Sequence, residues 1–218
     1  NMGDLDVLLD PIAAPRSVDN FSAYANRGAY DVTIIHRSTT YNRLDIQIVQ
    51  GGGFELVGNT LPPIPSDPPI PLEAGRANAL GTLAMARTSD PDSATSQWFF
   101  NVTDNPGLDF NYAVFGSVLG AGQNVIEAIG AVTVYNASAQ LGPVFGQLPL
   151  LSPSLSVDYL VLINRIRVAR FAITSLTHAS EAVEIRWTPL SINSPVRVER
   201  REKLGHGSWS VVSSNNAT

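Results

Sequence analysis

Apolar residues alternate with polar ones, or form short β-branched runs, in segments spread over the first three quarters of the chain. Such patterns are typical of β-strands, because successive side chains of a strand point to opposite faces. The predicted strands are residues 4–10, 31–37, 45–54, 80–87, 96–103, 112–118 and 157–168. Short, turn-rich links join them. This favours a mainly β fold, a closed antiparallel barrel of about eight strands, over alternating βαβ units.

Two segments place their apolar residues at helical spacing instead. The first begins at Pro15, which suits the first turn of a helix, and ends at Gly28. The second covers residues 124–132. We expect these two helices to cap the barrel. Residues 61–71, "LPPIPSDPPIP", are too rich in proline for a helix or an internal strand and predict a stiff loop of polyproline character.

The pattern changes beyond Ala169, where three short segments alternate apolar and polar side chains. Their apolar positions are Val183, Ile185, Trp187, Val196, Val198 and Trp209. Such alternation predicts antiparallel strands with one buried face, but about fifty residues are too few for a complete seven-strand sandwich. We therefore expect one domain at residues 3–168 and a partial β module at 169–218. The module loosely resembles immunoglobulin-like or fibronectin-like strand units.

Composition and charge exclude several classes of protein. The chain has 218 residues, of which 44% are hydrophobic and 15% charged, as in a globular protein rather than a disordered one. The net charge of -5 and the lack of a long basic run argue against nucleic acid as a partner. No apolar run approaches the ~20 residues of a membrane span. The start of the chain lacks the pattern of a signal peptide, which has been removed or was never present.

Cysteine is absent, which excludes disulfides and thiolate catalysis but does not identify the compartment. Periplasmic or secreted locations are weighed above a cytoplasmic one. His36, His178 and His206 lack the spacing of metal ligands, so no metal site is expected. The formal glycosylation sequons at Asn101 and Asn216 are interpreted as chance.

The segment from Ser89 to Asn101, "SDPDSATSQWFFN", places a glutamine directly before three large aromatic residues. In a strand, Gln97 and Phe99 share one face, and Trp98 and Phe100 share the other. An amide beside a flat apolar ring suits a site that holds peptide backbone and an apolar side chain together. The pattern therefore favours Gln97 and Phe99 as a binding surface.

The blocks "IIHR", "QIVQGGGF", "GTLAMARTSDPDSATSQWFFN" and "GLDFNYAVFGSV" occur in one order along the chain. In that order and spacing, residues 3–168 resemble the bacterial cyclophilin-type peptidyl-prolyl cis-trans isomerases. The resemblance implies an eight-stranded barrel, no cofactor, and proline-containing peptides and unfolded proteins as substrates. Cyclosporin is a further candidate ligand.

The resemblance also implies a set of site residues. Arg37 matches the catalytic arginine of the family, and a fixed cation is the group that can stabilise the twisted, less conjugated X-Pro amide. The implied substrate-binding residues are Ile48, Phe99 and Leu108 in an apolar recess, Gln50 and Gln97 at the peptide backbone, Ala86, Arg87 and Thr88 on an edge strand, and Tyr112. His36 is interpreted as structural, since the reaction requires no proton transfer.

The chain departs from the family pattern at two positions of the proline recess. The connection between Arg37 and Gln50 is about five residues longer than is common in the family. Counting back from Gln50 places Gln47 where the family has a phenylalanine, unless Ile46 or Tyr41 fills that place. Gly107 stands where the family has a tryptophan. These changes predict a shallower and more polar recess.

Two other functions remain open at this point. A proline-peptide binding module with little or no turnover would share Gln50, Gln97 and Phe99 with the enzyme. In the other, the C-terminal strands serve adhesion or surface anchoring, and the barrel is a passenger.

Overall fold

The computed structural model describes residues 2–39 and 46–168, together with the strands at 171–179, 182–189, 196–200 and 210–215. The chain divides into two compact units, Asn1–Ile166 and Arg167–Thr218. They are described separately below. No helix among the described residues has the length and apolar character needed to cross a membrane.

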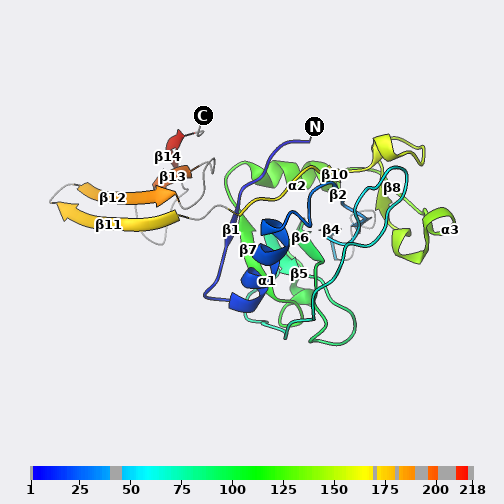
Figure 1. Ribbon diagram of the computed structural model, residues 1–218, viewed down its shortest axis with the longest axis horizontal. Coiled ribbons are helices and arrows are strands. Elements are labelled where there is room, and N and C mark those ends of the chain that lie inside the picture. The colour runs from blue at the N-terminus through cyan, green and yellow to red at the C-terminus, as the bar shows by residue number, and fades with distance from the viewer. Residues whose placement is uncertain are drawn as a thin grey trace. The chain divides into compact units, whose positions relative to one another are not determined.

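The first unit is built around a six-stranded antiparallel sheet (Figure 1). Its order is β1 (Val7–Leu9), β7 (Val114–Val118), β5 (Thr82–Met85), β6 (Trp98–Asn101), β4 (Ile48–Gly51) and β3 (Arg37–Ser38). Two further antiparallel pairs stand beside it, β2 (Thr33–Ile34) with β10 (Leu162–Ile163) and β8 (Val134–Tyr135) with β9 (Leu148–Pro149). The mainly β prediction is confirmed. The described pairings do not form the closed eight-stranded barrel that the sequence predicted.

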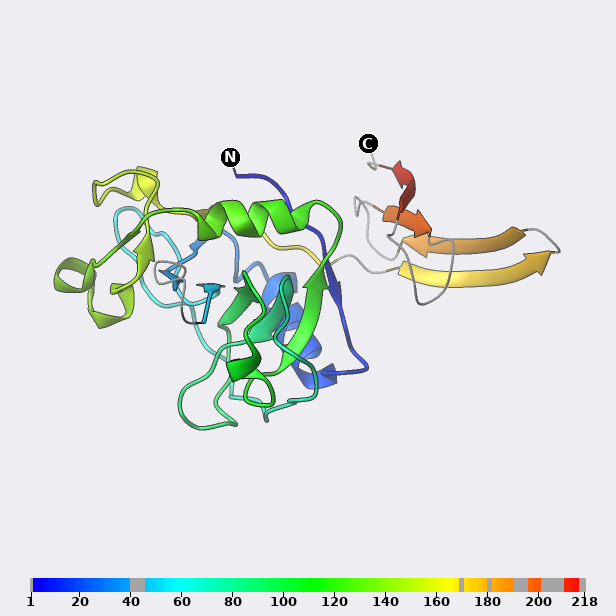
Figure 2. The ribbon, with the colours of Figure 1, turned by 180° about the vertical axis from the view of Figure 1, so that it is seen from behind.

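Both predicted helices are confirmed, as α1 (Pro15–Asn26) and α2 (Gly122–Gly130). In Figure 1 α1 lies in front of the sheet, and in Figure 2 it lies behind it. Helix α1 packs on the sheet through Phe21, whose ring lies 6.4 Å from that of Trp98 and 5.2 Å from that of Phe115. A short helix, α3 (Ser138–Leu141), and three 3-10 turns at Pro106–Leu108, Pro143–Phe145 and Val157–Tyr159 were not predicted.

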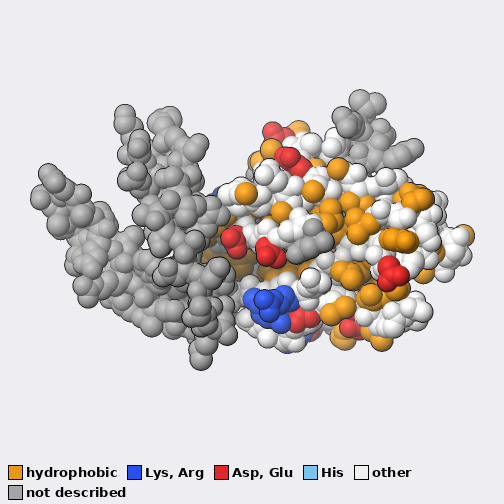
Figure 3. All heavy atoms as spheres, turned by 90° about the horizontal axis from the view of Figure 1, so that it is seen from above, with side chains coloured by type: hydrophobic (Ala, Val, Ile, Leu, Met, Phe, Trp, Pro, Cys, Tyr) orange, Lys and Arg blue, Asp and Glu red, His pale blue; other side chains and the backbone are white. Residues whose placement is uncertain are grey.

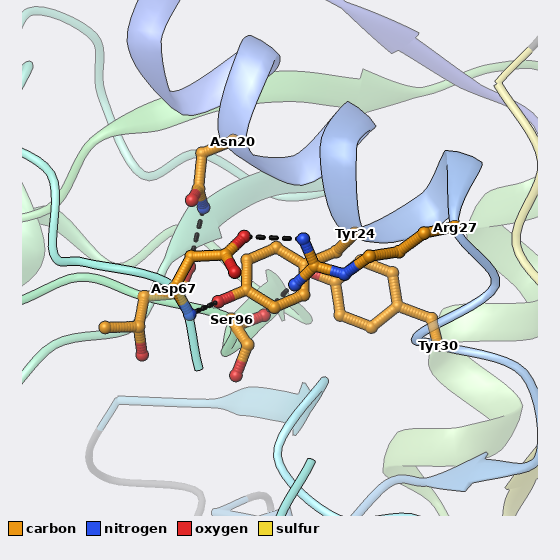
Figure 4. Close-up of polar contacts among 7 residues, drawn as sticks. Asn20, Tyr24, Arg27, Tyr30, Asp67 and Ser96 are labelled. Atoms are coloured by element: carbon orange, nitrogen blue, oxygen red, sulfur yellow. Dashed lines mark hydrogen bonds and ion pairs between the residues drawn. The ribbon is translucent and has the colours of Figure 1, made fainter. Parts of the chain in front are cut away.

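Helix α1 holds the proline-rich loop in place (Figure 4). The Arg27 guanidinium forms an ion pair of 2.6 Å with Asp67 and lies 4.1 Å from the centroid of the Tyr24 ring. The backbone N–H of Asp67 donates to the Tyr24 hydroxyl at 2.6 Å. At the other end of the helix, the Glu73 carboxylate accepts hydrogen bonds from the first-turn N–H groups of Arg16 and Ser17. The loop is therefore tied to α1 at Asp67, and the segment that follows it is tied at Glu73.

Two strand predictions were wrong in detail. The predicted strand at 157–168 is interrupted, because the Ser156 side chain accepts a hydrogen bond from the Asp158 N–H and starts a 3-10 turn. Only β10 of that segment is a strand. The predicted strand at 31–37 is split into β2 and β3, because its pairing partner changes from β10 to β4 along its length.

The face of the first unit seen in Figure 3 carries scattered hydrophobic side chains among uncharged ones, with few charged groups. This agrees with the low charged fraction of the sequence, 15%. Singly scattered apolar side chains are normal on a protein surface, so this face alone indicates no binding site.

The second unit consists of two antiparallel pairs in its described part. These are β11 (Phe171–Ala179) with β12 (Ala182–Pro189) and β13 (Val196–Arg200) with β14 (Ser210–Asn215). Strands were predicted at β12, β13 and β14, whereas β11 was not. Trp209 lies outside the described residues. The domain boundary at 168/169 and the separate core of the module stay predictions.

Candidate active site

Three of the predicted site residues lie in one row across the sheet. Arg37 of β3 pairs with Gln50 of β4, and Gln50 pairs with Phe99 of β6. Residues directly opposite one another in an antiparallel sheet point to the same face. The tertiary structure therefore brings these three side chains together from distant parts of the sequence.

A chain of hydrogen bonds connects Arg37 and Gln50, the polar members of this row, with Gln97 and Gln147. Arg37 Nη1 donates to Gln50 Oε1 at 3.1 Å, and Gln50 Nε2 donates to Gln97 Oε1 at 2.8 Å. On its other side Arg37 Nε donates to Gln147 Oε1 at 3.0 Å. The guanidinium is thus held between two amide oxygens that come from different parts of the chain.

These polar groups border a cavity of about 380 Å³. Its lining residues are His36, Arg37, Gln50, Phe54, Gln97, Pro143, Val144, Gly146 and Gln147. None of these lining residues is acidic, so within the cavity wall the Arg37 charge faces only neutral groups. As far as the described residues of the wall are concerned, this cation has no acidic partner and is available to a ligand.

Burial lowers the pKa of both basic residues in the cavity wall. Arg37 is half-buried, and desolvation lowers its pKa, an effect that the neighbouring Tyr112 opposes. Arginine remains charged in spite of such a shift, because its ordinary pKa is above 12. Burial, aided by the Arg37 charge, lowers the pKa of His36 to about 4, against a hydrogen bond with Gln97 that raises it. His36 is therefore neutral at pH 7.

The predicted apolar recess is a closed cluster in this structure. Ile48, Phe99 and Leu108 are only 5%, 2% and 6% exposed, and they pack together with Ala84 and Val114. Tyr112 covers the cluster, with its ring edge-on to Phe99 at 5.5 Å between centroids. Phe99 is thus packed as core, and the cavity lies beside Gln50 and Gln97, its neighbours on the same face of the sheet.

A network of hydrogen bonds between buried asparagine side chains holds the loop that contains Leu108. Asn101 Nδ2 donates to Asn78 Oδ1 at 3.2 Å, and Asn105 Nδ2 donates to Asn101 Oδ1 at 2.7 Å. Asn78 Nδ2 then donates to the Leu108 carbonyl at 3.1 Å. Asn101 is 0% exposed, so its sequon has no access to solvent and its interpretation as chance is supported.

The two departures from the family pattern lie at opposite ends of this network. The Gln47 N–H donates to Asn105 Oδ1 at 2.9 Å, and the Gln47 carbonyl accepts from Asn105 Nδ2 at 3.0 Å. Ile46 is 38% exposed, and Tyr41 lies outside the described residues. A Cβ atom added at Gly107 would meet no atom within 4 Å. The place of the family tryptophan is therefore open space.

Ala86, Arg87 and Thr88 were expected on an edge strand, and this expectation was wrong. Strand β5 ends at Met85 and pairs with β6 on one side and β7 on the other. Beyond its end, only Ala86 continues the pairing, through its N–H to the Gln97 carbonyl at 2.9 Å. The Arg87 guanidinium turns over the Tyr112 ring at 4.7 Å from its centroid.

The sequence pattern did not point to the segment Pro143–Gln147, nor to Phe54, as parts of the cavity wall. Gln147 lies 110 positions from Arg37, so no local spacing relates the two residues. The only local signal is that the apolar Val144 and Phe145 lie between two glycines, Gly142 and Gly146. The Phe145 side chain is 3% exposed and anchors the segment in the core.

Comparison with known proteins shows the family to which the chain is similar. Residues 1–144 match the family described as cyclophilin type peptidyl-prolyl cis-trans isomerase/CLD. Peptidyl-prolyl cis-trans isomerase A of Dickeya dadantii is 43% identical over 141 residues, which are 62% of this chain and 70% of the relative. Peptidyl-prolyl cis-trans isomerase B of Escherichia coli is 39% identical over 142 residues, 61% of this chain and 81% of the relative.

A solved structure shares the fold. It is a cyclophilin type peptidyl-prolyl cis-trans isomerase from Cryptosporidium parvum, crystallised in the presence of the dipeptide Ala-Pro. The TM-score is 0.54 at 21% identity, and the alignment covers 76% of this chain and 92% of the other. With the family match over residues 1–144 and the Arg37, Gln50 and Gln97 row in place, the chain belongs to the cyclophilin-type peptidyl-prolyl cis-trans isomerases.

Proposed function

We propose that this chain catalyses cis-trans isomerisation of X-Pro bonds in peptides and unfolded proteins, with Arg37 as the catalytic residue. The observation that carries the proposal is the hydrogen-bonded row of Arg37, Gln50 and Gln97 at the edge of a cavity. An X-Pro bond crosses a barrier of ~18–20 kcal/mol, because the amide is conjugated. A group that binds the twisted amide better than either planar form lowers this barrier without any covalent step.

The Arg37 guanidinium suits that role through its remaining donors. A guanidinium has five N–H groups, and two of those on Arg37 are used by Gln50 and Gln147 within the described residues. No other described residue bonds the remaining three, and they are proposed to hydrogen-bond the prolyl nitrogen or a neighbouring carbonyl of the substrate. Because both protein partners are neutral amides, the positive charge is left for the transition state.

Gln50 and Gln97 are proposed to hold the backbone of the substrate beside Arg37. Each side-chain amide offers both donors and acceptors, and their mutual hydrogen bond of 2.8 Å uses only part of that capacity. The rings and methyl groups of Ile48, Phe99 and Leu108 are proposed to contact the proline. Since these three are nearly fully buried, the cluster has to open before a proline ring can reach them.

This closed cluster favours a second candidate function, a proline-peptide binding module with little or no turnover. A proline that stays at the rim of the cluster would bind through Gln50 and Gln97 without the orientation that Arg37 requires. The two functions differ in the rate of isomerisation that they predict, and not in the affinity for proline peptides.

The experiment is a protease-coupled isomerisation assay on a proline peptide, with and without cyclosporin, alongside a binding titration with the same peptide. The enzyme accelerates exchange well above the uncatalysed rate, and a cyclosporin-sensitive rate would identify cyclosporin as a ligand of the same site. Binding of the peptide without any acceleration would reject the enzyme and leave the binding module.

We also propose that the sheets of the first unit close into the eight-stranded barrel that the family resemblance implies. Hydrogen bonds beyond the six-stranded sheet support closure on one side. Ile35 N–H donates to the Val161 carbonyl at 2.9 Å, and Ser38 N–H donates to the Gln147 carbonyl at 2.9 Å. Hydrogen-exchange protection of amides along both edges, β1 and β10, would test it, because a closed barrel leaves no unpaired edge.

A further inference from the structure

Arg37 is held by two amide oxygens, and only one of them belongs to the sheet row described above. Gln50 accepts from Nη1, while Gln147 accepts from Nε at 3.0 Å. We propose that Gln147 is a positioning residue for Arg37, which sets the orientation of the guanidinium plane. The proposal rests on the isomerase activity proposed above and goes beyond it, because Gln147 lies outside the family match over residues 1–144.

The backbone of Gln147 is fixed to the strand that carries Arg37. The N–H of Ser38, the neighbour of Arg37, donates to the Gln147 carbonyl at 2.9 Å. On either side of Gln147, Phe145 and Leu148 are buried, at 3% and 0% exposure, and both belong to one core cluster. The backbone of Gln147 is therefore held beside Arg37, and only the side-chain rotamers of Gln147 have to be ordered when it binds Nε.

The same segment forms one wall of the cavity. The Phe145 ring lies 4.8 Å from that of Phe54, and Phe54 itself lines the cavity. Next to this anchor Val144 is 52% exposed and faces the cavity together with Pro143. The segment thus has a buried side that holds it and an open side that meets a ligand.

The chemistry explains why an amide suits this position. A guanidinium that pivots about its Nε–H does not present its Nη hydrogens in one direction. An oxygen on Nε and another on Nη1 define the plane, and the outer edge of the guanidinium then faces the substrate. A neutral acceptor fixes this plane without cancelling the charge that stabilises the twisted amide.

The test compares Gln147→Leu, which keeps the size of the side chain but removes the acceptor, with Gln140→Leu as a matched control. Gln140 lies on α3, is exposed, and does not line the cavity. For Gln147→Leu we expect kcat about tenfold lower with KM nearly unchanged, the size expected for the loss of one hydrogen bond to a charged group. The control should retain the wild-type kcat and KM.

A spectroscopic readout separates positioning from a general structural role. The 1H-15N signal of Arg37 Nε, assigned by its disappearance in Arg37→Lys, should exchange slowly with water in the wild type and faster in Gln147→Leu. Gln147→Glu keeps an acceptor oxygen at the same distance and should keep the slow exchange. If Gln147→Leu fails to fold, the exchange rate of the Arg37 Nε proton in Gln147→Glu still tests the proposal, and fast exchange in that variant would contradict it.

The outcomes distinguish this proposal from the one on which it rests. A wild-type protein without isomerase activity would overturn the proposed function. An active wild type with unchanged kcat and unchanged Nε exchange in Gln147→Leu would overturn the role of Gln147 alone. A change in KM without a change in kcat or Nε exchange would likewise overturn it, because it would identify Gln147 as part of the cavity wall only.

Discussion

At the scale of single residues, Arg37 is the side chain on which turnover is expected to depend. Arg37→Ala should lower kcat by orders of magnitude and change peptide affinity little, because the hydrogen bond to the amide is made mainly in the transition state. Arg37→Lys should recover little, since an ammonium cannot reproduce the donors held by Gln50 and Gln147. Steady-state kinetics and a peptide titration measure the two effects. An Arg37→Ala variant as fast as the wild type would contradict the assignment.

Gly107 offers a gain-of-function test at the same scale. Because a Cβ atom there meets nothing within 4 Å, Gly107→Trp should fit and add an apolar surface beside Leu108. We expect affinity for proline peptides to rise by roughly tenfold, the effect of burying about one aromatic contact. Gly75→Trp, at an equally open position next to Arg76, is the matched control. Equal affinities of the two variants would show that this place is not part of the proline site.

The lowered pKa of His36 predicts that the folded protein is sensitive to acid. The His36 pKa is about 4 in the folded protein and near 6.5 when unfolded, so the unfolded state takes up a proton more readily. The stability due to neutral His36 is complete above pH 6.5 and is lost as the pH falls from 6.5 to 4, by up to roughly 3 kcal/mol. Denaturant unfolding across that range should show the loss, and His36→Gln should flatten it. An equally steep loss in the variant would exclude His36 as its source.

At the scale of elements, Asn101 joins β6 to the loop that carries Leu108. Its side chain bonds Asn78 and Asn105 and is fully buried, so Asn101→Ala leaves buried amide groups without partners. The variant should lose about 2–3 kcal/mol of unfolding free energy. Chemical denaturation measures this, with Asn124→Ala on the exposed face of α2 as the control. Equal losses in the two variants would mean that the network does not hold the loop.

At the scale of the whole molecule, the two compact units predict that the first unit is active by itself. All cavity-lining residues and the whole family match belong to the first unit, Asn1–Ile166. A chain trimmed near Ala169 should therefore keep its kcat within about twofold and unfold as a single cooperative unit. Isomerase assays and thermal denaturation of the trimmed chain check this. Loss of activity while the first unit stays folded would show that the C-terminal strands belong to the site.

The sequence by itself determined the elements whose signals are local. Pro15 and Gly28 mark the ends of α1. The alternation in residues 97–100 predicts a strand in which Gln97 and Phe99 share one face and the two residues that alternate with them share the other. The ordered blocks containing Arg37 were enough to identify the family. These signals survive because side-chain periodicity and turn chemistry act over a few residues, whatever the rest of the chain does.

Only the tertiary structure decided how the site is shaped. It closed Phe99 and Leu108 into a core cluster and left the cavity beside Gln50 and Gln97, on the same face of the sheet. It also brought Gln147 to Arg37 across 110 positions. The physical reason is that burial and hydrogen-bond partners depend on which distant segments pack together, and no period in the sequence records that choice.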